Sequence, residues 1–283
     1  MAKPRSSGNN AGSALATKIL QQPRGASLHR GIVPMATGPL PLTAESMEDE
    51  DFDLESLAKY LHLGAAQLAR LAERGQLPGR KVAGHWRFYR PEITFWLEQR
   101  IGLAEPDDLA RMEGVLERAV QVPPDELQSI TDLLPIQAIA VPLAARTRAS
   151  AIEGLVQTAA RTGWLWDERR MIEGVRIREQ LCPTALDEGV ALMHPRRPLA
   201  DALERPLIAF GRAESGIPFG HPRGVLTDLF FLLCSTTDRG HLHALARLSR
   251  LLSDPKFLAE LRWADDAAAV HAALRAREQA LLQ

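Results

Sequence analysis

Cysteine is scarce in this 283-residue chain, and its two cysteines, Cys182 and Cys234, lie far apart in apolar stretches. Two such cysteines cannot build a disulfide framework or a cysteine-based zinc site, so we expect a reducing cytoplasm as the location, with no metal and no cofactor. No apolar run approaches the roughly 18 residues that a membrane span needs, so we expect no membrane insertion. Neither sign of charge dominates, because 34 Lys and Arg face 35 Asp and Glu. Any nucleic-acid surface must therefore be local.

The first 50 residues contain no Phe, Trp or Tyr, and they carry five Gly and five Pro among Ser, Asn and Ala. Such a segment buries too little apolar surface to offset the entropy of ordering, so we expect residues 1–50 to form a disordered tail. The tail has no continuous apolar segment of the kind found in signal peptides, although its composition leaves a transit peptide as an alternative.

Residues 51–102 have the pattern of a small domain of short elements. Leucines at helical spacing over 54–61 and again over 68–75 predict two short helices joined by a tight turn. Residues 77–89 read as a hairpin with its turn near Ala83-Gly84, and Pro91 opens a third helix. Beyond this domain, two helical stretches separated by Pro123-Pro124 predict a helical linker over residues 103–134.

The strings 54–61, 68–75, 76–82 and 84–88 resemble the excisionase-like winged helix-turn-helix of the MerR superfamily. The resemblance implies that the second helix enters the major groove of duplex DNA and that the hairpin contacts phosphate or the minor groove. The residues expected to contact DNA are Gln67, Arg70, Arg74, Lys81, His85 and Arg87. The turn over residues 64–67 departs from the family because it lacks a Ser or Thr cap. A module that binds protein or is purely structural remains the alternative, and Trp86, Phe88 and Trp96 are expected to form the core on either interpretation.

Residues 135–283 alternate short apolar runs with amphipathic stretches. We expect strands at 136–141, 190–193, 207–210 and 228–234, and helices at 150–162 and 241–252 with two more after them. Strands interleaved with helices indicate an α/β fold.

His194 stands out among the eight histidines because it follows the apolar run 189–193 and precedes the basic loop 195–198. An imidazole at the end of a buried strand is a nucleophile that can be desolvated, and its ordinary pKa of about 6.5 leaves it largely neutral in the cytoplasm. Neighbouring arginines are suited to binding a phosphoryl group.

The strings 178–181, 184–186 and 189–194 resemble the phosphoacceptor region of enzyme IIA type-2 domains of the bacterial phosphotransferase system, the fructose, mannitol and nitrogen-regulatory class. The likeness continues in the expected order to the C-terminus and implies a mixed sheet flanked by helices over residues 135–283. It also implies that His194 accepts phosphate through Nε2 from phospho-HPr, the histidine phosphocarrier protein. Arg178 then orients the phosphate, His241 is the second histidine of the site, and Thr184 donates a hydrogen bond.

The resemblance is incomplete at two positions, because Met193 and Pro195 stand where the family usually has Pro and Gly. Alternatives remain open for the other site residues: helix-start packing for His241, a surface ion pair for Arg178 and a simple cap for Thr184. A degenerate domain that only senses is the alternative for His194.

Together the two domains predict a cytoplasmic regulator that accepts phosphate from phospho-HPr on His194 and couples it to the binding of DNA or a partner. One alternative is a phosphocarrier that passes phosphate to a separate IIB protein in sugar uptake. Another is a scaffold that is never phosphorylated. The chain carries no cysteine-bearing IIB domain and no membrane IIC domain, which favours regulation.

Overall fold

The computed structural model describes residues 51–61, 63–102, 104, 107–110, 113–114 and 129–281. The predicted tail over residues 1–50 and most of the predicted linker lie outside the described residues. The chain divides into two compact units with the boundary between Trp96 and Leu97, inside the helix α4 (Arg90–Ile101). Within the described ranges, no helix is long and apolar enough to cross a membrane.

The first unit contains the helices and the hairpin that the sequence predicts. Helix α2 (Leu54–Leu61) is followed by α3 (Ala65–Glu73), and strands β2 (Arg80–Val82) and β3 (His85–Tyr89) form the hairpin. The short strand β1 (Asp51–Phe52) adds to β3, so the order in the sheet is β1-β3-β2. Ala83 and Gly84 at the hairpin turn have φ of 49° and 83°, which a tight two-residue hairpin requires.

The core of the first unit is mainly aliphatic, and its buried aromatic residues are Phe52, Tyr60 and Phe88. Its fully buried side chains, at most 2% exposed, are Leu57, Leu68, Leu71, Leu77, Phe88 and Ile93. The expectation that Trp86 and Trp96 are core residues is wrong, because both are only half-buried. Trp96 lies at the edge, where its indole N–H finds a polar partner and donates to the Gln76 carbonyl at 2.8 Å.

The second unit is built on a mixed four-stranded sheet. Its strands are β4 (Ile139–Leu143), β5 (Val190–Met193), β6 (Leu207–Pro218) and β7 (Leu226–Cys234). The order is β4-β6-β7-β5, with an antiparallel pair in the centre and a parallel pair on each side. The predicted α/β architecture with a mixed sheet flanked by helices is confirmed.

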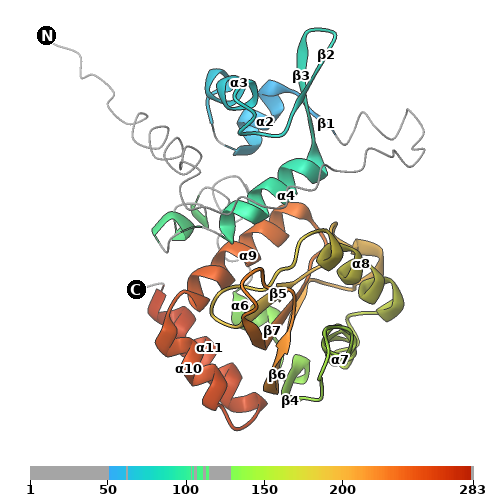
Figure 1. Ribbon diagram of the computed structural model, residues 1–283, viewed down its shortest axis with the longest axis vertical. Helices are drawn as coiled ribbons and strands as arrows, with labels where there is room; N and C mark the ends of the chain where they lie inside the picture. Colours follow the sequence, from blue (N-terminus) through green and yellow to red (C-terminus); the bar gives the residue numbers. More distant parts are fainter. Residues whose placement is uncertain are drawn as a thin grey trace, which may run out of the picture. The chain divides into compact units, whose positions relative to one another are not determined.

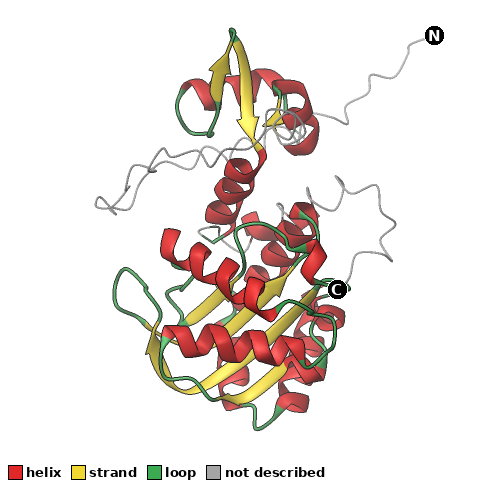
Figure 2. Cartoon of the chain, turned by 90° about the vertical axis from the view of Figure 1, so that its right-hand side faces the viewer, coloured by secondary structure: helices red, strands yellow, loops and turns green. Residues whose placement is uncertain are grey.

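Helices cover both faces of this sheet, as Figures 1 and 2 show. Helices α7 (Arg148–Ala160) and α8 (Glu168–Leu181) lie on one side. On the other side lie α9 (Asp238–Leu252), α10 (Pro255–Trp263) and α11 (Ala267–Leu281). The remaining short elements are α6 (Ile130–Leu133) and 3₁₀ turns at Ile136–Ala138 and Ala200–Ala202.

Three elements differ from the sequence-based expectation. The first strand begins at Ile139 because the residues before it form a 3₁₀ turn, and β6 continues eight residues beyond Phe210, to Pro218. Helix α8 is not predicted by periodicity because its many charged residues leave only a narrow apolar stripe, Met171 and Val175.

Candidate functional site

Two histidines meet at one edge of the sheet in the second unit. Strands β5 and β7 are parallel neighbours, with Met193 opposite Leu232, so their carboxyl ends reach the same edge. His194 directly follows β5, and His241 lies in the first turn of α9, the helix that follows β7. The two ring centroids are 4.6 Å apart. The sheet topology therefore pairs residues that are 47 positions apart in the sequence.

Arg178 comes to the same place from the last turn of α8. That helix packs closely on the loop after His194, since a Cβ added to Gly174 would lie 3.0 Å from the Pro195 Cβ. Arg178 is buried rather than on the surface, and its Nη1 donates to the Cys182 carbonyl at 2.6 Å. The alternative of a surface ion pair is therefore wrong for Arg178.

Glu98 completes the cluster and was not predicted from the sequence. It lies on the last turn of α4, which belongs to the second unit. Its Oε2 is 3.1 Å from Arg178 Nη2 and 3.8 Å from His194 Nε2, and its Oε1 is 3.3 Å from His241 Nε2. All four residues are between 2% and 5% exposed. A carboxylate thus lies among two imidazoles and a guanidinium in a site closed to solvent.

The tautomer of His194 follows from its backbone partner. Its Nδ1 lies 3.1 Å from the Pro195 carbonyl oxygen, which can only accept, so Nδ1 carries the proton and donates. The lone pair is then on Nε2, which lies 3.8 Å from Glu98 Oε2. Complete burial lowers the pKa of His194 to about 3, so the ring is neutral at physiological pH. A neutral imidazole with a free Nε2 lone pair is a competent nucleophile.

Glu98 is ionised in this site. Burial alone would raise its pKa, but the imidazoles of His194 and His241 and the guanidinium of Arg178 lower the pKa instead. His241 is oriented by Ser235, whose Oγ lies 3.4 Å from the His241 Nδ1. The site therefore holds one buried anion against one buried cation.

Thr184 is engaged elsewhere. Its hydroxyl donates to the Glu179 carboxylate, and its backbone N–H donates to the same carboxylate at 3.2 Å. Glu179 also accepts from Arg148 Nη2 at 2.8 Å. Thr184 thus belongs to a polar cluster with Glu179 and Arg148, and its predicted hydrogen bond to phosphate requires this cluster to rearrange.

The residues expected to contact DNA lie on α3, at its C-cap Arg74 and on the hairpin of the first unit. Those with exposed side chains are Arg70, Arg74, Lys81, His85 and Arg87, while Gln67 is half-buried. Lys81 lies over the Trp86 ring, with Nζ 5.0 Å from the ring centroid. Arg80, a further cation of the hairpin, is paired with Asp51 at 3.0 Å. Gly64 precedes α3 without a side-chain cap, as the sequence indicates.

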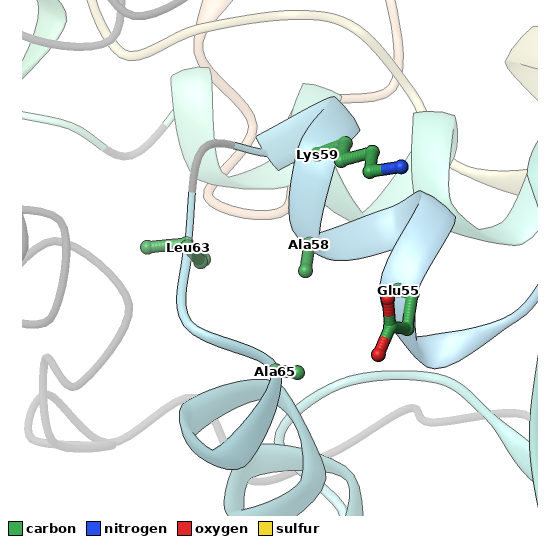
Figure 3. Close-up of a pocket in the computed structure, with 5 residues that line it drawn as sticks. All are labelled: Glu55, Ala58, Lys59, Leu63 and Ala65. Carbon is green, nitrogen blue, oxygen red and sulfur yellow. The ribbon is translucent and has the colours of Figure 1, made fainter.

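The first unit also has an open hollow beside α2 and the start of α3 (Figure 3). The residues that line it are Glu55, Ala58, Lys59, Leu63 and Ala65. This lining contains no histidine, cysteine or serine, and its two charged residues, Glu55 and Lys59, belong to the exposed surface of α2. The cluster around His194 is the stronger candidate for chemistry.

Comparison with known proteins identifies the second unit. Residues 132–276 match the family described as "Phosphoenolpyruvate-dependent sugar phosphotransferase system, EIIA 2", and the chain belongs to this family. It is 37% identical over 148 residues to a nitrogen regulatory protein of Bradyrhizobium diazoefficiens, covering 51% of this chain and 94% of the relative.

Two further matches are to a phosphotransferase component and a solved structure. The chain is 30% identical over 125 residues to the fructose-specific EIIABC component of Bacillus subtilis, covering 44% of this chain and 19% of that protein. The crystal structure of the nitrogen regulatory protein IIA-Ntr from Neisseria meningitidis aligns with a TM-score of 0.47 at 25% identity, covering 51% of this chain and 98% of the other.

The buried neutral His194 makes the fold sensitive to acid. The unfolded chain protonates this ring at a pKa of about 6.5, whereas the folded pKa is about 3. Between these two pKa values the unfolded state therefore binds more protons than the folded state. The contribution of His194 to the free energy of unfolding is thus largest above pH 6.5 and is lost as the pH falls toward 3. Urea unfolding at pH 7, 6, 5 and 4 measures this slope.

The variant His194→Gln is expected to have a flatter profile of unfolding free energy against pH than the wild type. His85→Gln, which removes an exposed imidazole from the first unit, is the matched control. An equally steep profile in His194→Gln and the wild type would assign the acid sensitivity to other groups.

Proposed function

We propose that this protein is a cytoplasmic regulator of the phosphotransferase system that accepts a phosphoryl group from phospho-HPr on His194. Its phosphorylation state then alters the binding of the first unit to DNA or to a partner. The observation that carries the proposal is the buried His194, with Nδ1 held by the Pro195 carbonyl and Nε2 3.8 Å from the Glu98 carboxylate oxygen that pairs with Arg178. Membership of the EIIA type-2 family supports a role as phosphocarrier or regulator.

The proposed transfer is a displacement at phosphorus. The Nε2 lone pair of His194 forms a bond to the phosphorus of the donor phosphohistidine while the donor N–P bond breaks, and that electron pair stays on the donor imidazole. The Nδ1 proton of His194 remains in its hydrogen bond to the Pro195 carbonyl. No net proton is gained or lost, so positioning and charge neutralisation are the main demands on the protein.

Arg178 and His241 meet these demands in the proposal. A buried guanidinium neutralises the oxygens of the transferring phosphoryl group more strongly than it would in water. His241 Nε2 is buried and lies 3.3 Å from Glu98 Oε1, and in the proposal a phosphoryl oxygen takes the place of this carboxylate oxygen. Both side chains are held by their helices before the donor arrives, which lowers the cost of reorganisation.

A labelling reaction tests this function. The full chain is incubated with enzyme I, HPr and phosphoenolpyruvate, and its intact mass is then measured. The expected product carries one phosphoryl group that is lost in acid and kept in base, because acid protonates the phosphoramidate nitrogen and promotes cleavage. Absence of any label, in the presence of a known IIA domain that is labelled in parallel, would contradict the proposal.

A carrier role in sugar uptake is the second candidate, favoured by the likeness to a fructose-specific EIIABC component. The two roles differ in the fate of the phosphoryl group. A carrier passes it on rapidly when a separate IIB protein is added, whereas a regulator keeps it and changes its binding of DNA or a partner.

The DNA assignment predicts a strongly salt-dependent interaction of the full chain with duplex DNA. Arg87→Ala is expected to weaken binding to every sequence and to reduce the dependence of binding on salt by about one phosphate contact. Arg70→Ala is expected to cost about 1–3 kcal/mol and to change base preference if Arg70 reaches a base edge. Mobility shifts across a range of salt concentrations measure both effects.

Arg169→Ala is the matched control for these substitutions, because Arg169 is an exposed arginine of the second unit. It is expected to bind DNA as the wild type does. If the wild type fails to bind any duplex at low salt, the first unit is a protein-interaction module.

A further inference from the structure

The anion in the candidate site is supplied by the chain itself. Glu98 places one carboxylate oxygen 3.1 Å from Arg178 Nη2 and the other 3.3 Å from His241 Nε2. These two groups are the ones that the proposed function assigns to the phosphoryl oxygens. Glu98 Oε2 lies 3.8 Å from His194 Nε2, a separation too small to admit a phosphoryl group, so this carboxylate stands where a phosphoryl group on Nε2 would extend.

We propose that Glu98 is an internal mimic of the phosphoryl group that closes the site in the unphosphorylated protein. The last turn of α4 must move away before His194 can be phosphorylated, and phosphorylated His194 in turn keeps Glu98 out. This inference rests on the proposed function of His194 and adds a regulation of that same site.

Charge makes the two states mutually exclusive. A carboxylate and a phosphoryl group are both anions, and both need the one guanidinium that Arg178 provides. Two anions buried side by side repel each other, and one left without its cation costs several kcal/mol. Phosphorylation therefore replaces the Glu98–Arg178 pair with a phosphoryl–Arg178 pair rather than adding to it.

The last turn of α4 is anchored at the site by more than its carboxylate. Leu97 and Ile101 are buried, and Gln99 Nε2 lies 3.6 Å from the Sγ of Cys182. The Cys182 carbonyl in turn accepts from Arg178 Nη1. Release of Glu98 thus loosens one compact set of contacts around Arg178, which is the behaviour expected of an element with two discrete states.

The same helix links this switch to the first unit. Helix α4 is continuous from Arg90 to Ile101, and its first half contributes the buried Ile93 to the core of the first unit. A change at Glu98 is therefore a change in the helix that joins the two units covalently. This gives the phosphorylation state of His194 a physical route toward the first unit.

A metal ion is the competing interpretation, because ligand atoms of Glu98, His194 and His241 all lie within 4.8 Å of one another. The Arg178 guanidinium disfavours it, since a fixed positive charge 3.1 Å from the same carboxylate repels a cation. The cluster has the charge pattern of an anion site.

The test compares rates of phosphoryl transfer from phospho-HPr to the full-length protein. Glu98→Ala, which empties the position, is expected to be phosphorylated at least tenfold faster than the wild type. Glu98→Gln keeps the shape and removes the charge, so its rate is expected to lie between the two. Glu92→Gln removes a carboxylate from the same helix within the first unit and is expected to leave the rate unchanged.

Hydrogen exchange of the wild type provides a second readout that needs no substitution. The amides of residues 97–101 are expected to exchange slowly before phosphorylation and at least tenfold faster after it. Unchanged protection after phosphorylation would overturn the inference. In unphosphorylated Glu98→Gln, exchange that is faster at residues 97–101 and not over β5 and β7 separates release of the turn from global destabilisation.

The possible outcomes separate this inference from the function on which it rests. If the wild type is phosphorylated and both Glu98 variants react no faster, the internal mimic is wrong and the function of His194 stands. If neither the wild type nor either variant is phosphorylated, both ideas fail together. Stoichiometric Zn²⁺ binding by the wild type that is lost in Glu98→Gln would also overturn the inference, in favour of a metal site.

Discussion

His194→Ala is expected to abolish phosphoryl uptake from phospho-HPr completely. The substitution removes the Nε2 lone pair of the imidazole that packs beside His241 and lies 3.8 Å from the Glu98 carboxylate, the partner of Arg178. Because the forming bond itself is lost, the expected effect is total rather than a reduction in rate. Incorporation of labelled phosphate from phosphoenolpyruvate, through enzyme I and HPr, measures it.

His243→Ala is the matched control because His243 is also buried and lies only two residues after His241 on α9. It is expected to keep the label as long as the variant folds, which circular dichroism checks. Labelling that persists in His194→Ala and disappears in His243→Ala would move the acceptor and overturn the assignment of Nε2.

Arg178→Ala carries the second largest expected effect, a slowing of phosphoryl transfer by about 100-fold to 1,000-fold. The guanidinium is the only described cation in contact with both Glu98 and the space beside His194 Nε2, so its loss leaves the transferring oxygens without a counter-charge. Arg178→Lys is expected to recover part of the rate, because lysine restores the charge and lacks the planar fork of donors. Single-turnover kinetics from phospho-HPr measure both.

Arg178→Ala is also expected to lower the stability of the fold, and a second substitution at Glu98 separates this effect from the effect on rate. Removing one partner of a buried ion pair typically costs about 3–5 kcal/mol, because the other charge is left uncompensated. The double variant Arg178→Ala with Glu98→Ala removes both charges and is expected to regain most of the lost stability. It is not expected to regain the rate, and a full recovery of rate would show that Arg178 acts only by holding Glu98.

Most strands and helices of the second unit were predictable from the sequence, with α8 as the exception, but the pairing of the strands was not. The apolar run that forms β5 and the run that forms β7 are visible as strands, and His194 is visible as the residue after the first of them. Nothing in either run shows that the two strands are parallel neighbours. That His241 lies beside His194 was expected only from the resemblance to enzyme IIA type-2 domains, because a resemblance to a family implies the topology of its fold.

Glu98 shows where sequence reasoning stops. It follows Leu97 in a helix that reads as the last element of the first unit, and a carboxylate in such a helix is normally solvated. Its burial depends on Arg178 and His194, which lie 80 and 96 positions further along the chain. A long-range charge pair of this kind leaves no periodic signal. The only hint is a charged residue on a helix face shared with Thr94 and Ile101, both of which are buried.

Trp86 and Thr184 show the same dependence on the tertiary fold. Trp86 is large and apolar and was assigned to the core, but in this short hairpin its ring is only half covered and carries Lys81 above it. Thr184 was assigned to the phosphate, whereas Glu179 binds its hydroxyl. In both cases the residue type was read correctly, and the neighbours that decide its contacts were set by the tertiary fold.

Nitrogen-15 and phosphorus NMR of the phosphorylated protein, with labelled histidine, tests the central claim most directly. The account predicts a single phosphohistidine, His194, whose Nε2 is coupled to phosphorus and whose Nδ1 still carries its proton. The same spectra of His194→Ala should show no phosphorus coupling to any ring nitrogen. A phosphoryl group on Nδ1 of His194, or on any other residue of the wild type, would contradict the account.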